Sequence, residues 1–541
     1  MKAQGEHMAF GRVVVAGLLV LAGLGCTGRT GTDDSTSSSS SSSGAASGGS
    51  SGNVAMSSSV AGSSAAGSSS RASGSSAAAS SAMGSSAAGS SGRAASSSAA
   101  GSSSAVVTSS SSSAGGACGV ITTFAQGLGP TTRIHVQAGA NAAGANGSEA
   151  NPFPTISAAA AVATPGTAIT IHAGTYAGGT FLTGLTGTAQ APIWLGGAPG
   201  ESRPVLEGGG EGLHLVRAVY VVLHDLEIRN STANGINADD AADYANTLAS
   251  HHVVFERLNI HDIGSGGNQD CLKLSGLNNL WVVNNTFTAC SAGGSAIDHV
   301  GCHNGVVAGN TFTNVGNAVQ AKGGSTDILI RANVVNTTSS RAFNLGGSTG
   351  FEFFRPPLST TTANAEAQRI HADANIILNA AEAIAFPGCV DCRVANNTII
   401  FPTTRVFRIL QETVSDATYT FTASSSGLVA NNIILFNVAQ VTNAGRALNV
   451  GGNTNAASYT FANNLWYAAD NPATVFNLAE VTEMNRVTGQ NPNLTNAATG
   501  DAHIPTNSPA VGVGRVVAGV DGDHGGRCWL NPPSIGAFEG G

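Results

Sequence analysis

The chain has 541 residues, of which 10% are charged and 5% aromatic, and it contains 71 glycines. A typical soluble domain has about 25% charged residues and about 7% glycine. The net charge of −8 argues against a nucleic-acid partner, because a protein that binds nucleic acid presents a basic face. No apolar run reaches the roughly 20 residues of a membrane span, which excludes a polytopic membrane protein.

The N-terminus has the organisation of an export signal. Lys2 and Arg12 precede an apolar run at residues 13–24, which has the length of a signal-peptide core. Residues 21–26 resemble a bacterial lipobox, in which Cys26 becomes the lipidated first residue of the mature protein. The resemblance predicts contact with a membrane through a lipid anchor only. The alternative is an ordinary cleaved signal (residues 1–26) of a secreted protein.

Residues 27–117 consist almost entirely of Ser, Ala and Gly. Such a tract has too little apolar surface to offset its ordering entropy, so the composition predicts a disordered, flexible linker. A lipid anchor followed by a long linker suits a protein displayed away from a membrane. We therefore expect an exported protein of the cell envelope or cell surface, with one folded domain at residues 118–541.

The folded part repeats one short pattern, in which β-forming residues flank a position that is often Asn. Short strands separated by Asn and Gly turns at a regular spacing are typical of a parallel β-helix, in which each repeat is one coil and Asn stacks at the bend. A β-sandwich would not need Asn at the same position of successive repeats, so we expect an all-β solenoid. The repeated position is occupied by Leu226, Leu258, Asn285, Asn310, Asn333, Asn375, Asn397, Asn432 and Asn464.

Both ends of the folded domain carry informative segments. The Ala-rich residues 155–163 predict a short helix that caps the first coil, followed by a strand at residues 168–176. Residues 147–176 resemble the opening segment of right-handed parallel β-helix proteins of the pectate-lyase-like superfamily. Residues 508–512 and 533–539 resemble the closing segment of the same group. The resemblance implies a single-stranded right-handed parallel β-helix with an N-terminal capping helix.

One strand of each coil is predicted to carry polar side chains on its outer side. Alternation with period 2 places every second side chain outside, and equivalent residues of successive coils lie about 4.8 Å apart. A lengthwise row of polar side chains suits an extended polymer such as a polysaccharide; the alternative is an ordinary solvated sheet face. The predicted inner residues are Ile236, Leu272, Ile297, Val319 and Phe343. The predicted outer row is Asn237, Lys273, Asp298, Gln320 and Asn344, with Asp239, Ser275 and Lys322 on the same face.

Two segments near this row resemble motifs of polysaccharide lyase family nine. Residues 267–276 resemble the segment around the catalytic lysine of that family, which implies that Lys273 is the Brønsted base. The residues Asp239, Asp240 and Asp243 match the Asp-Asp-x-x-Asp spacing of the family's calcium site, which implies that they hold Ca²⁺. The family's motif runs into its strand, whereas here the acidic residues follow the strand. Aligned by strand, the family's last Asp corresponds to Asn237, and a further upstream ligand has only Glu211 as a candidate.

The implied reaction is β-elimination on a uronic acid. The base removes the proton on C5, which becomes acidic only when the adjacent carboxylate is neutralised, and Ca²⁺ is suited to that task. A lysine base must be neutral near the working pH, through desolvation or nearby positive charge. Asp298 is predicted one coil from Lys273, and an ion pair between them would raise the lysine pKa and oppose this role. A purely structural salt bridge is the alternative interpretation of this pair.

Further residues are candidates for binding the acidic sugar. Arg341 and Arg355 flank Asn344, and arginine pairs with carboxylates in a bidentate manner; the alternative is that both only contribute to solubility. His299 is predicted to point into the core. The predicted substrate-binding residues are Asp298, Gln320, Lys322, Arg341, Asn344 and Arg355. Arg405, Arg408 and Glu412 either extend the groove or form a local ion pair.

Seven cysteines remain when Cys26 is set aside. An exported protein permits disulfides, and an odd number leaves at least one cysteine unpaired. Cys389 and Cys392 are expected to form a local bridge or to remain two buried thiols. Cys290 and Cys302, on neighbouring coils, are a candidate pair.

Three functions are compatible with the sequence. The first is a monomeric lyase that cleaves an acidic polysaccharide by Ca²⁺-assisted β-elimination. The second is a non-catalytic surface module that binds glycan or protein along the coils. The third is a β-helix glycoside hydrolase, which needs at least two converging carboxylates, and Asp239, Asp270 and Asp298 are the candidates.

Overall fold

The computed structural model describes residues 117–264, 266–441, 447–474, 476–478 and 480–541. The predicted signal segment, Cys26 and all of the predicted linker except residue 117 lie outside the described residues. Within the described part, no helix combines the length and the apolar character that crossing a membrane requires.

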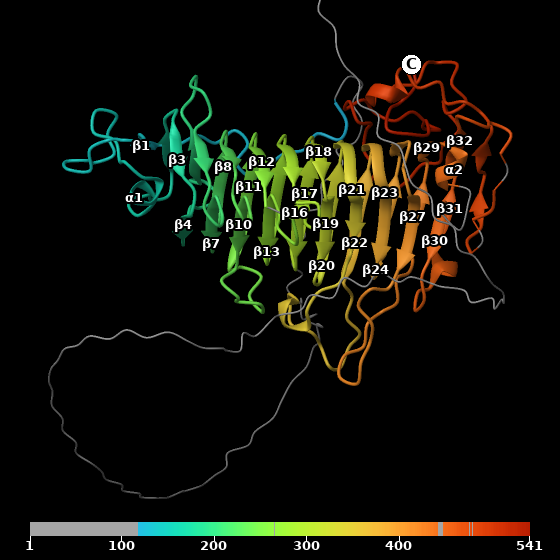
Figure 1. The fold of residues 1–541 in the computed structure, drawn as a ribbon, viewed down its shortest axis with the longest axis horizontal. Helices are drawn as coiled ribbons and strands as arrows, with labels where there is room; N and C mark the ends of the chain where they lie inside the picture. Colours follow the sequence, from blue (N-terminus) through green and yellow to red (C-terminus); the bar gives the residue numbers. More distant parts are fainter. Residues whose placement is uncertain (1–116, 265, 442–446, 475, 479) are drawn as a thin grey trace, which may run out of the picture. The chain divides into compact units, whose positions relative to one another are not determined.

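The described residues form a stack of coils, and strands of successive coils pair in parallel (Figure 1). This confirms the predicted parallel β-helix. Each coil has three faces, and the first is a separate sheet. Its strands are β1 (Thr132–Val136), β2 (Thr167–Ile171), β5 (Ile193–Gly197), β8 (Val219–His224), β11 (Ser250–Glu256), β14 (Leu277–Val283), β17 (His303–Ala308), β20 (Ser325–Arg331), β22 (Ala367–Asp373), β24 (Cys389–Val390), β25 (Arg393–Ala395), β28 (Leu428–Ala430), β31 (Thr460–Ala462) and β33 (Glu483–Met484).

The second and third faces are joined by two long strands that belong to both, β21 (Val334–Leu345) and β23 (Ile376–Pro387). The other strands of the second face are β3 (Thr175–Ala177), β6 (Val205–Glu207), β9 (Glu227–Arg229), β12 (Asn259–Ile263), β15 (Thr286–Cys290), β18 (Thr311–Val315), β26 (Thr398–Ile400), β29 (Ile433–Phe436), β32 (Leu465–Ala468) and β34 (Val487–Thr488). Those of the third face are β4 (Thr180–Thr183), β7 (Leu213–Val216), β10 (Ile236–Asp239), β13 (Leu272–Ser275), β16 (Ser295–Val300), β19 (Asn317–Lys322), β27 (Arg405–Leu410) and β30 (Leu448–Val450).

The first coil is capped by the short helix α1 (Ile156–Ala160), as predicted. The Thr155 hydroxyl accepts a hydrogen bond from the Ala158 N–H at the start of the helix, and Ile156 and Ala159 pack into the core. The remaining helical turns are α2 (Val438–Val441), η1 (Phe351–Phe353), η2 (Ala456–Ser458) and η3 (Ala497–Thr499).

The prediction of one strand at residues 168–176 was wrong, because the chain turns a corner between β2 and β3. The Tyr176 hydroxyl fixes this corner: it donates to the His172 carbonyl and accepts from the Ala138 N–H. The first four residues of the predicted strand therefore belong to a different face from the last two.

The bend between the first and second faces is held by a ladder of buried asparagines, as predicted. Each side-chain amide and each backbone N–H of a ladder residue donates to the side-chain oxygen of the next one, at 2.8–3.0 Å. Leu258 begins the ladder by donating its N–H to Asn285, and Glu483 ends it by accepting from Asn464. The ladder residues are Asn285, Asn310, Asn333, Asn375, Asn397, Asn432 and Asn464.

The C-terminal segment lies against the outer side of the second face. Ala510 and Ile535 pack on Ile433 and Leu465, so the tail covers a sheet and not the open end of the stack. At that end, Phe476 packs on Trp466, with ring centroids 5.1 Å apart.

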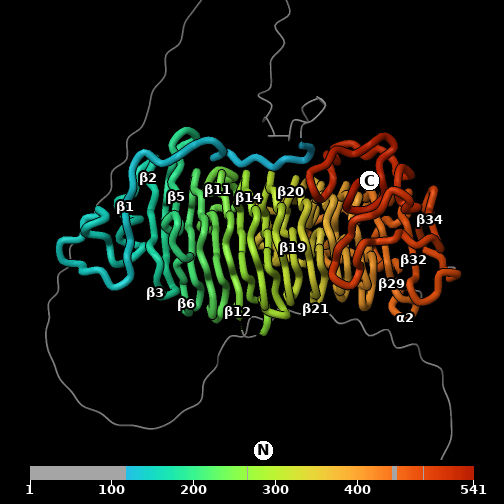
Figure 2. The backbone as a smooth tube through the Cα atoms, turned by 90° about the horizontal axis from the view of Figure 1, so that it is seen from above, coloured from blue at the N-terminus to red at the C-terminus, as the bar shows by residue number. Residues whose placement is uncertain are grey.

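The opening segment, residues 117–131, runs along the outer side of the first face toward the first coil (Figure 2). Phe124 is its apolar anchor and packs against Tyr220, His252 and Trp281. A disulfide between Cys118 and Cys528 ties the start of this segment, which we call the strap, to the C-terminal segment.

The cysteine pairing corrects one prediction. Cys290 pairs with Cys271 and not with Cys302, which is buried and is the free cysteine of the described residues. Cys271 directly precedes β13, and Cys290 ends β15 after almost one full turn of the solenoid, with Cα atoms 5.6 Å apart. The register pairs Cys290 with Ile263 of the coil that contains Cys271, so the bridge joins neighbouring coils where the second face turns into the third. Cys389 and Cys392 form the local bridge.

Candidate functional site

The outer side of the third face carries the predicted row of polar side chains. The register pairs Asn237 with Lys273, Lys273 with Asp298, Asp298 with Gln320 and Gln320 with Asn344. The five predicted inner residues, Ile236, Leu272, Ile297, Val319 and Phe343, are completely buried, as the alternation requires. Asp239, Ser275 and Lys322 occupy the neighbouring outer row.

The centre of the row is an ion cluster around Lys273. The Nζ of Lys273 donates to Asp298 Oδ2 at 2.6 Å and to Asp270 Oδ2 at 3.0 Å. Both carboxylates are 1% exposed, whereas the Lys273 side chain is 25% exposed. Lys322 Nζ lies 3.7 Å from the second oxygen of Asp298, which has no hydrogen-bond partner among the described atoms. Two lysines and two aspartates therefore form a neutral cluster of which Lys273 is the most exposed member.

The surrounding charges decide the protonation of this cluster. Burial would lower the pKa of Lys273, but the charges of Asp298 and Asp270 outweigh burial and raise it above its ordinary value. Burial would raise the pKa of Asp298, but Lys273 and Lys322 hold it below its ordinary value. The pKa of Asp270 is raised by its burial and by the charge of Asp298. Lys273 is therefore a fixed cation, as the salt-bridge interpretation of the sequence anticipates.

The next part of the face is rich in arginine. Glu382 accepts from three guanidinium groups: from Arg341 at 3.2 Å, from Arg405 at 2.7 Å and from Arg408 at 3.0 Å. Arg341 also donates to Glu412 at 2.8 Å and to the side-chain oxygen of Asn344 at 2.8 Å. Three arginines face two glutamates, so this part carries one net positive charge. Arg405 and Arg408 thus extend the polar face and at the same time form a local ion-pair cluster.

The three aspartates that the sequence suggests as calcium ligands do not converge. Asp239 lies 2.7 Å from His214 Nε2, and Asp243 lies 3.4 Å from a nitrogen of Arg217. Asp240 is buried and accepts two hydrogen bonds from Arg355, at 2.7 and 3.0 Å. Among the described residues, no group of three or more His, Cys, Asp or Glu residues is placed to hold a metal ion. Asp240 and Asp243 already pair with arginines and Asp239 contacts a histidine, so the arrangement does not fit a calcium site.

Arg355 is accordingly placed beneath the surface. Its guanidinium is held by Asp240, by the Phe353 carbonyl and by the ring of Tyr244, whose centroid lies 4.5 Å away. The prediction that Arg355 binds a sugar does not fit this burial, because all of these contacts are made within the protein. His299 is completely buried, as predicted, and burial lowers its pKa to about 4.

Sequence reasoning missed two contributors to this face. Glu382 follows Arg341 in the register of the next coil, and the alternation around Ile384 would have located it. Phe181 is aligned with His214 at the first coils of the row and is 57% exposed. In the sequence, Phe181 could have been recognised as an aromatic residue that precedes an inward-facing leucine in a short strand.

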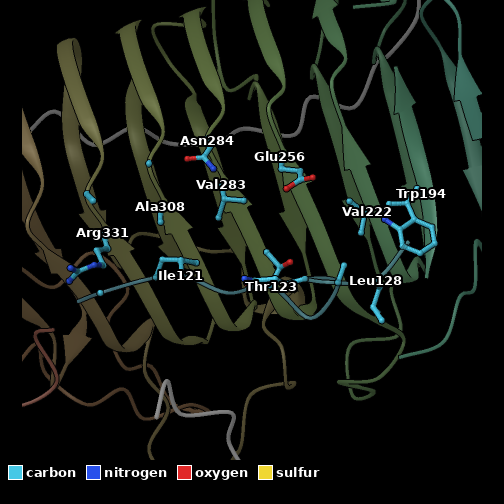
Figure 3. Close-up of a pocket in the computed structure, with 15 residues that line it drawn as sticks. Ile121, Thr123, Leu128, Trp194, Val222, Glu256, Val283, Asn284, Ala308 and Arg331 are labelled. Carbon is cyan, nitrogen blue, oxygen red and sulfur yellow. The ribbon is translucent and has the colours of Figure 1, made fainter. Parts of the chain in front are cut away.

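A separate hollow of about 520 Å³ lies between the strap and the outer side of the first face (Figure 3). Its lining includes Trp194, Val222, Val283, Glu256 and Arg331. The strap covers an apolar patch here, which accounts for its position.

Comparison with known proteins supports the fold. Residues 211–356 match a protein family described as "Right handed beta helix region". The coils form a right-handed parallel β-helix. No curated protein matches the chain.

The chain is similar to several solved structures at low sequence identity. Pectate lyase Pel9A is 16% identical with a TM-score of 0.47, and the match covers 77% of this chain and 98% of that protein. An alginate lyase from Paenibacillus sp. str. FPU-7 is 17% identical with a TM-score of 0.39, over 66% and 100% of the two chains. A rhamnogalacturonan lyase is 12% identical with a TM-score of 0.36, over 66% and 87%.

Proposed function

We propose that the third face binds an extended acidic polysaccharide, and that the protein acts as a monomer. The observation that carries the proposal is the state of Lys273, a cation fixed by two buried carboxylates in the middle of a lengthwise polar row. The ammonium group has three donors, and two of them are used within the protein. The third donor and the exposed part of the side chain are available to an acidic sugar.

The cations of the face are spaced along the solenoid axis. Lys273 on β13 and Arg341 on β21 are separated by three strand-to-strand steps, or roughly 14 Å. Arg405 and Arg408 lie two further steps along, on β27. A polymer with carboxylates at intervals along its length matches this spacing better than a small molecule does.

Calorimetric titration of the full chain with oligogalacturonate and oligoalginate tests the proposal. We expect binding that weakens as salt is added, because exposed charges are screened. Arg405→Ala should weaken binding by about tenfold. Arg257→Ala is the control, because Arg257 is an exposed arginine that pairs with Asp225 at the first face. Equal affinity of the wild type and Arg405→Ala, or no binding at all, would contradict the proposal.

The second candidate is the β-elimination that the sequence predicts, with Lys273 as the base. The observation that favours it is that Lys273 reaches the surface in the middle of the row, while the carboxylates beneath it are buried. Its raised pKa opposes the reaction, because the amine must be neutral before it accepts a proton. This candidate therefore requires that substrate binding separate Lys273 from Asp270 and Asp298. The implied calcium would also have to displace Arg355 and His214 from their aspartates.

One assay distinguishes the functions. The full chain is incubated with pectate, alginate and glycosaminoglycans, with Ca²⁺ or with EDTA, and the ultraviolet absorbance of unsaturated products is followed. Absorbance that depends on Ca²⁺ and disappears in Lys273→Ala supports the lyase. New reducing ends without absorbance support a hydrolase that uses Asp239, Asp270 or Asp298. Binding without either product supports the binding function.

We also propose that the protein is exported and anchored through Cys26. The three disulfides in the described residues support an oxidising compartment. Mass spectrometry of the mature protein should find a lipid on Cys26, and Cys26→Ser should release the protein from the membrane fraction. A mature N-terminus at another residue would contradict the anchor and favour simple secretion.

A further inference from the structure

We infer that the β4 end of the third face is a subsite for an uncharged sugar unit, with Phe181 as the stacking partner of the sugar ring. The inference rests on the proposed function, because it assigns one unit of the same polysaccharide to one end of the same face. It adds a substrate class: a polysaccharide in which neutral units adjoin acidic ones.

Phe181 lies in the outer row of the third face, and its ring is exposed to solvent. Its neighbour Leu182 is 3% exposed and points inward, whereas Phe181 is 57% exposed. The register runs from Phe181 through His214 and Asn237 to Lys273. The Phe181 ring meets the ring of His214 edge-on, with centroids 4.5 Å apart and planes at 62°. The C–H bonds on one side of a pyranose pack well on an exposed aromatic ring, which removes apolar surface of both partners from water.

Hydrogen-bonding groups are fixed beside this ring. Glu211 Oε1 accepts from the amides of Asn234 and Asn237, each at 3.1 Å, and Glu211 Oε2 lies 2.9 Å from His214 Nδ1. The other ring nitrogen of His214 lies 2.7 Å from Asp239 Oδ2. The side chains of His214, Asp239 and Glu211 keep 18%, 20% and 25% exposure. Their positions are set before a ligand arrives, so binding sugar hydroxyls requires little ordering of side chains.

The charge of this end excludes an acidic unit. Two carboxylates, Glu211 and Asp239, share one imidazole, so the group carries at least one net negative charge. The arginine cluster around Glu382 carries one net positive charge at the other end of the row. A uronate or a sulfated sugar is therefore repelled beside Phe181 and attracted toward β21 and β27. An uncharged sugar ring with several hydroxyls can stack on Phe181 and donate hydrogen bonds to Glu211 and Asp239.

The register gives the distance along the solenoid between Phe181 and Lys273. Phe181 on β4 and Lys273 on β13 are three strand-to-strand steps apart, or roughly 14 Å. A chain that lies on Phe181 with a neutral unit thus reaches Lys273 with a unit a few positions away. A homopolymer of uronate would place a carboxylate against Glu211 and Asp239.

The test compares two kinds of ligand by calorimetric titration of the full chain. The first kind, unsulfated chondroitin and glucuronoxylan fragments, contains neutral and acidic units; the second, oligogalacturonate, is acidic at every unit. We expect the wild type to bind one of the mixed ligands about tenfold more tightly than oligogalacturonate. Phe181→Leu should remove this preference, and Phe181→Tyr should keep it, because a ring is retained. Val516→Ala, which removes an exposed apolar group outside the row, is the control and should keep the preference.

The outcomes separate this inference from the proposed function. If Phe181→Leu binds the mixed ligand more weakly and oligogalacturonate with unchanged affinity, the result supports both the subsite and the proposed binding function. An unchanged preference in Phe181→Leu, or a wild type without a preference, overturns the subsite and leaves the binding function intact. A wild type that binds none of the ligands overturns the binding function and the subsite with it. Equal thermal unfolding midpoints of all variants establish that they are folded.

Discussion

Lys273 illustrates how local charge decides what a residue can do. A lysine on an open sheet face can act as a base or as a cationic anchor, and these roles require opposite protonation states. Here Asp298 and Asp270 are buried against the wall of the solenoid and contact the same nitrogen. Their charges favour the ammonium form, so the geometry favours binding over proton abstraction.

The first prediction concerns the carboxylate beneath Lys273. Asp298→Asn removes a charge from a buried ion cluster and leaves Lys273 with Asp270 alone, so the free energy of unfolding should fall by about 3–5 kcal/mol. Asp327→Asn is the control, because Asp327 pairs with Arg369 at an exposed position, and it should cost less than about 1 kcal/mol. Urea unfolding measures both. Equal losses in the two variants would show that the Lys273 cluster has no special role in stability.

The second prediction concerns pH. Burial lowers the pKa of His252, His299 and His371 to about 4, below the ordinary value of 6.5. Between these two values the unfolded chain binds protons at these positions and the native chain does not. The free energy of unfolding should therefore fall as the pH falls from about 6.5 to about 4.

His299 allows this pH dependence to be assigned, because it is completely buried. Its contribution to the loss should be on the order of 3 kcal/mol. His299→Gln should reduce the dependence of the unfolding free energy on pH in this window. An unchanged pH dependence in that variant would assign the effect to other groups.

At the scale of elements, the asparagine ladder keeps the strands of successive coils in register although the coils differ in length. Its members are 22 to 42 residues apart in sequence, yet every step is made by the same hydrogen bonds. Loops of any length can therefore be inserted at the corners while the strands stay aligned.

The third prediction follows from the ladder. Asn333→Ala leaves the backbone N–H and the side-chain amide of Asn310 without their acceptor in a buried position. Chemical denaturation should show a loss of about 2–4 kcal/mol, since two buried donors lose a partner. Asn278→Ala is the control, because Asn278 is a partly exposed asparagine that accepts from Asn304, and it should cost about 1 kcal/mol or less. A loss in the ladder variant as small as in the control would contradict this account.

The sequence predicts regular features of this fold much better than pairings between distant residues. The alternation around Ile236 and the repeated Asn position follow from local periodicity, so the strands, the core and the polar row could be predicted. The ion pair of Asp240 with Arg355 joins residues 115 positions apart through a loop, and no local pattern marks it. The calcium site was expected from a resemblance to a family motif, and such a motif does not reveal which carboxylates already have partners within the protein.

At the scale of the molecule, one disulfide joins the strap to the C-terminal segment. The disulfide between Cys118 and Cys528 spans 410 residues, so it holds together two segments at opposite ends of the folded sequence. The strap thereby covers the apolar outer patch of the first face, and Phe124 fixes it there.

The fourth prediction concerns the disulfide between Cys118 and Cys528. Cys118→Ser should lower the free energy of unfolding by about 2–4 kcal/mol, because a bridge over a long loop restricts the unfolded chain strongly. Limited proteolysis should then cut within residues 117–131. Cys389→Ser is the control, since its bridge spans a sequence separation of only 3, and it should leave the strap protected. A strap that stays protected in Cys118→Ser would show that its apolar contacts alone hold it.

The lysines provide the most direct test of the central claim. The chain has three lysines, Lys2, Lys273 and Lys322, and the last two lie beside each other on the proposed binding face. Lysine labelled with ¹³C at Cε therefore gives a nuclear magnetic resonance spectrum with very few signals, which Lys322→Arg assigns. We predict that the Lys273 signal titrates above the ordinary lysine pKa and shifts when an acidic oligosaccharide is added. A Lys273 that titrates below that value, or that does not respond to any acidic oligosaccharide, would contradict the account.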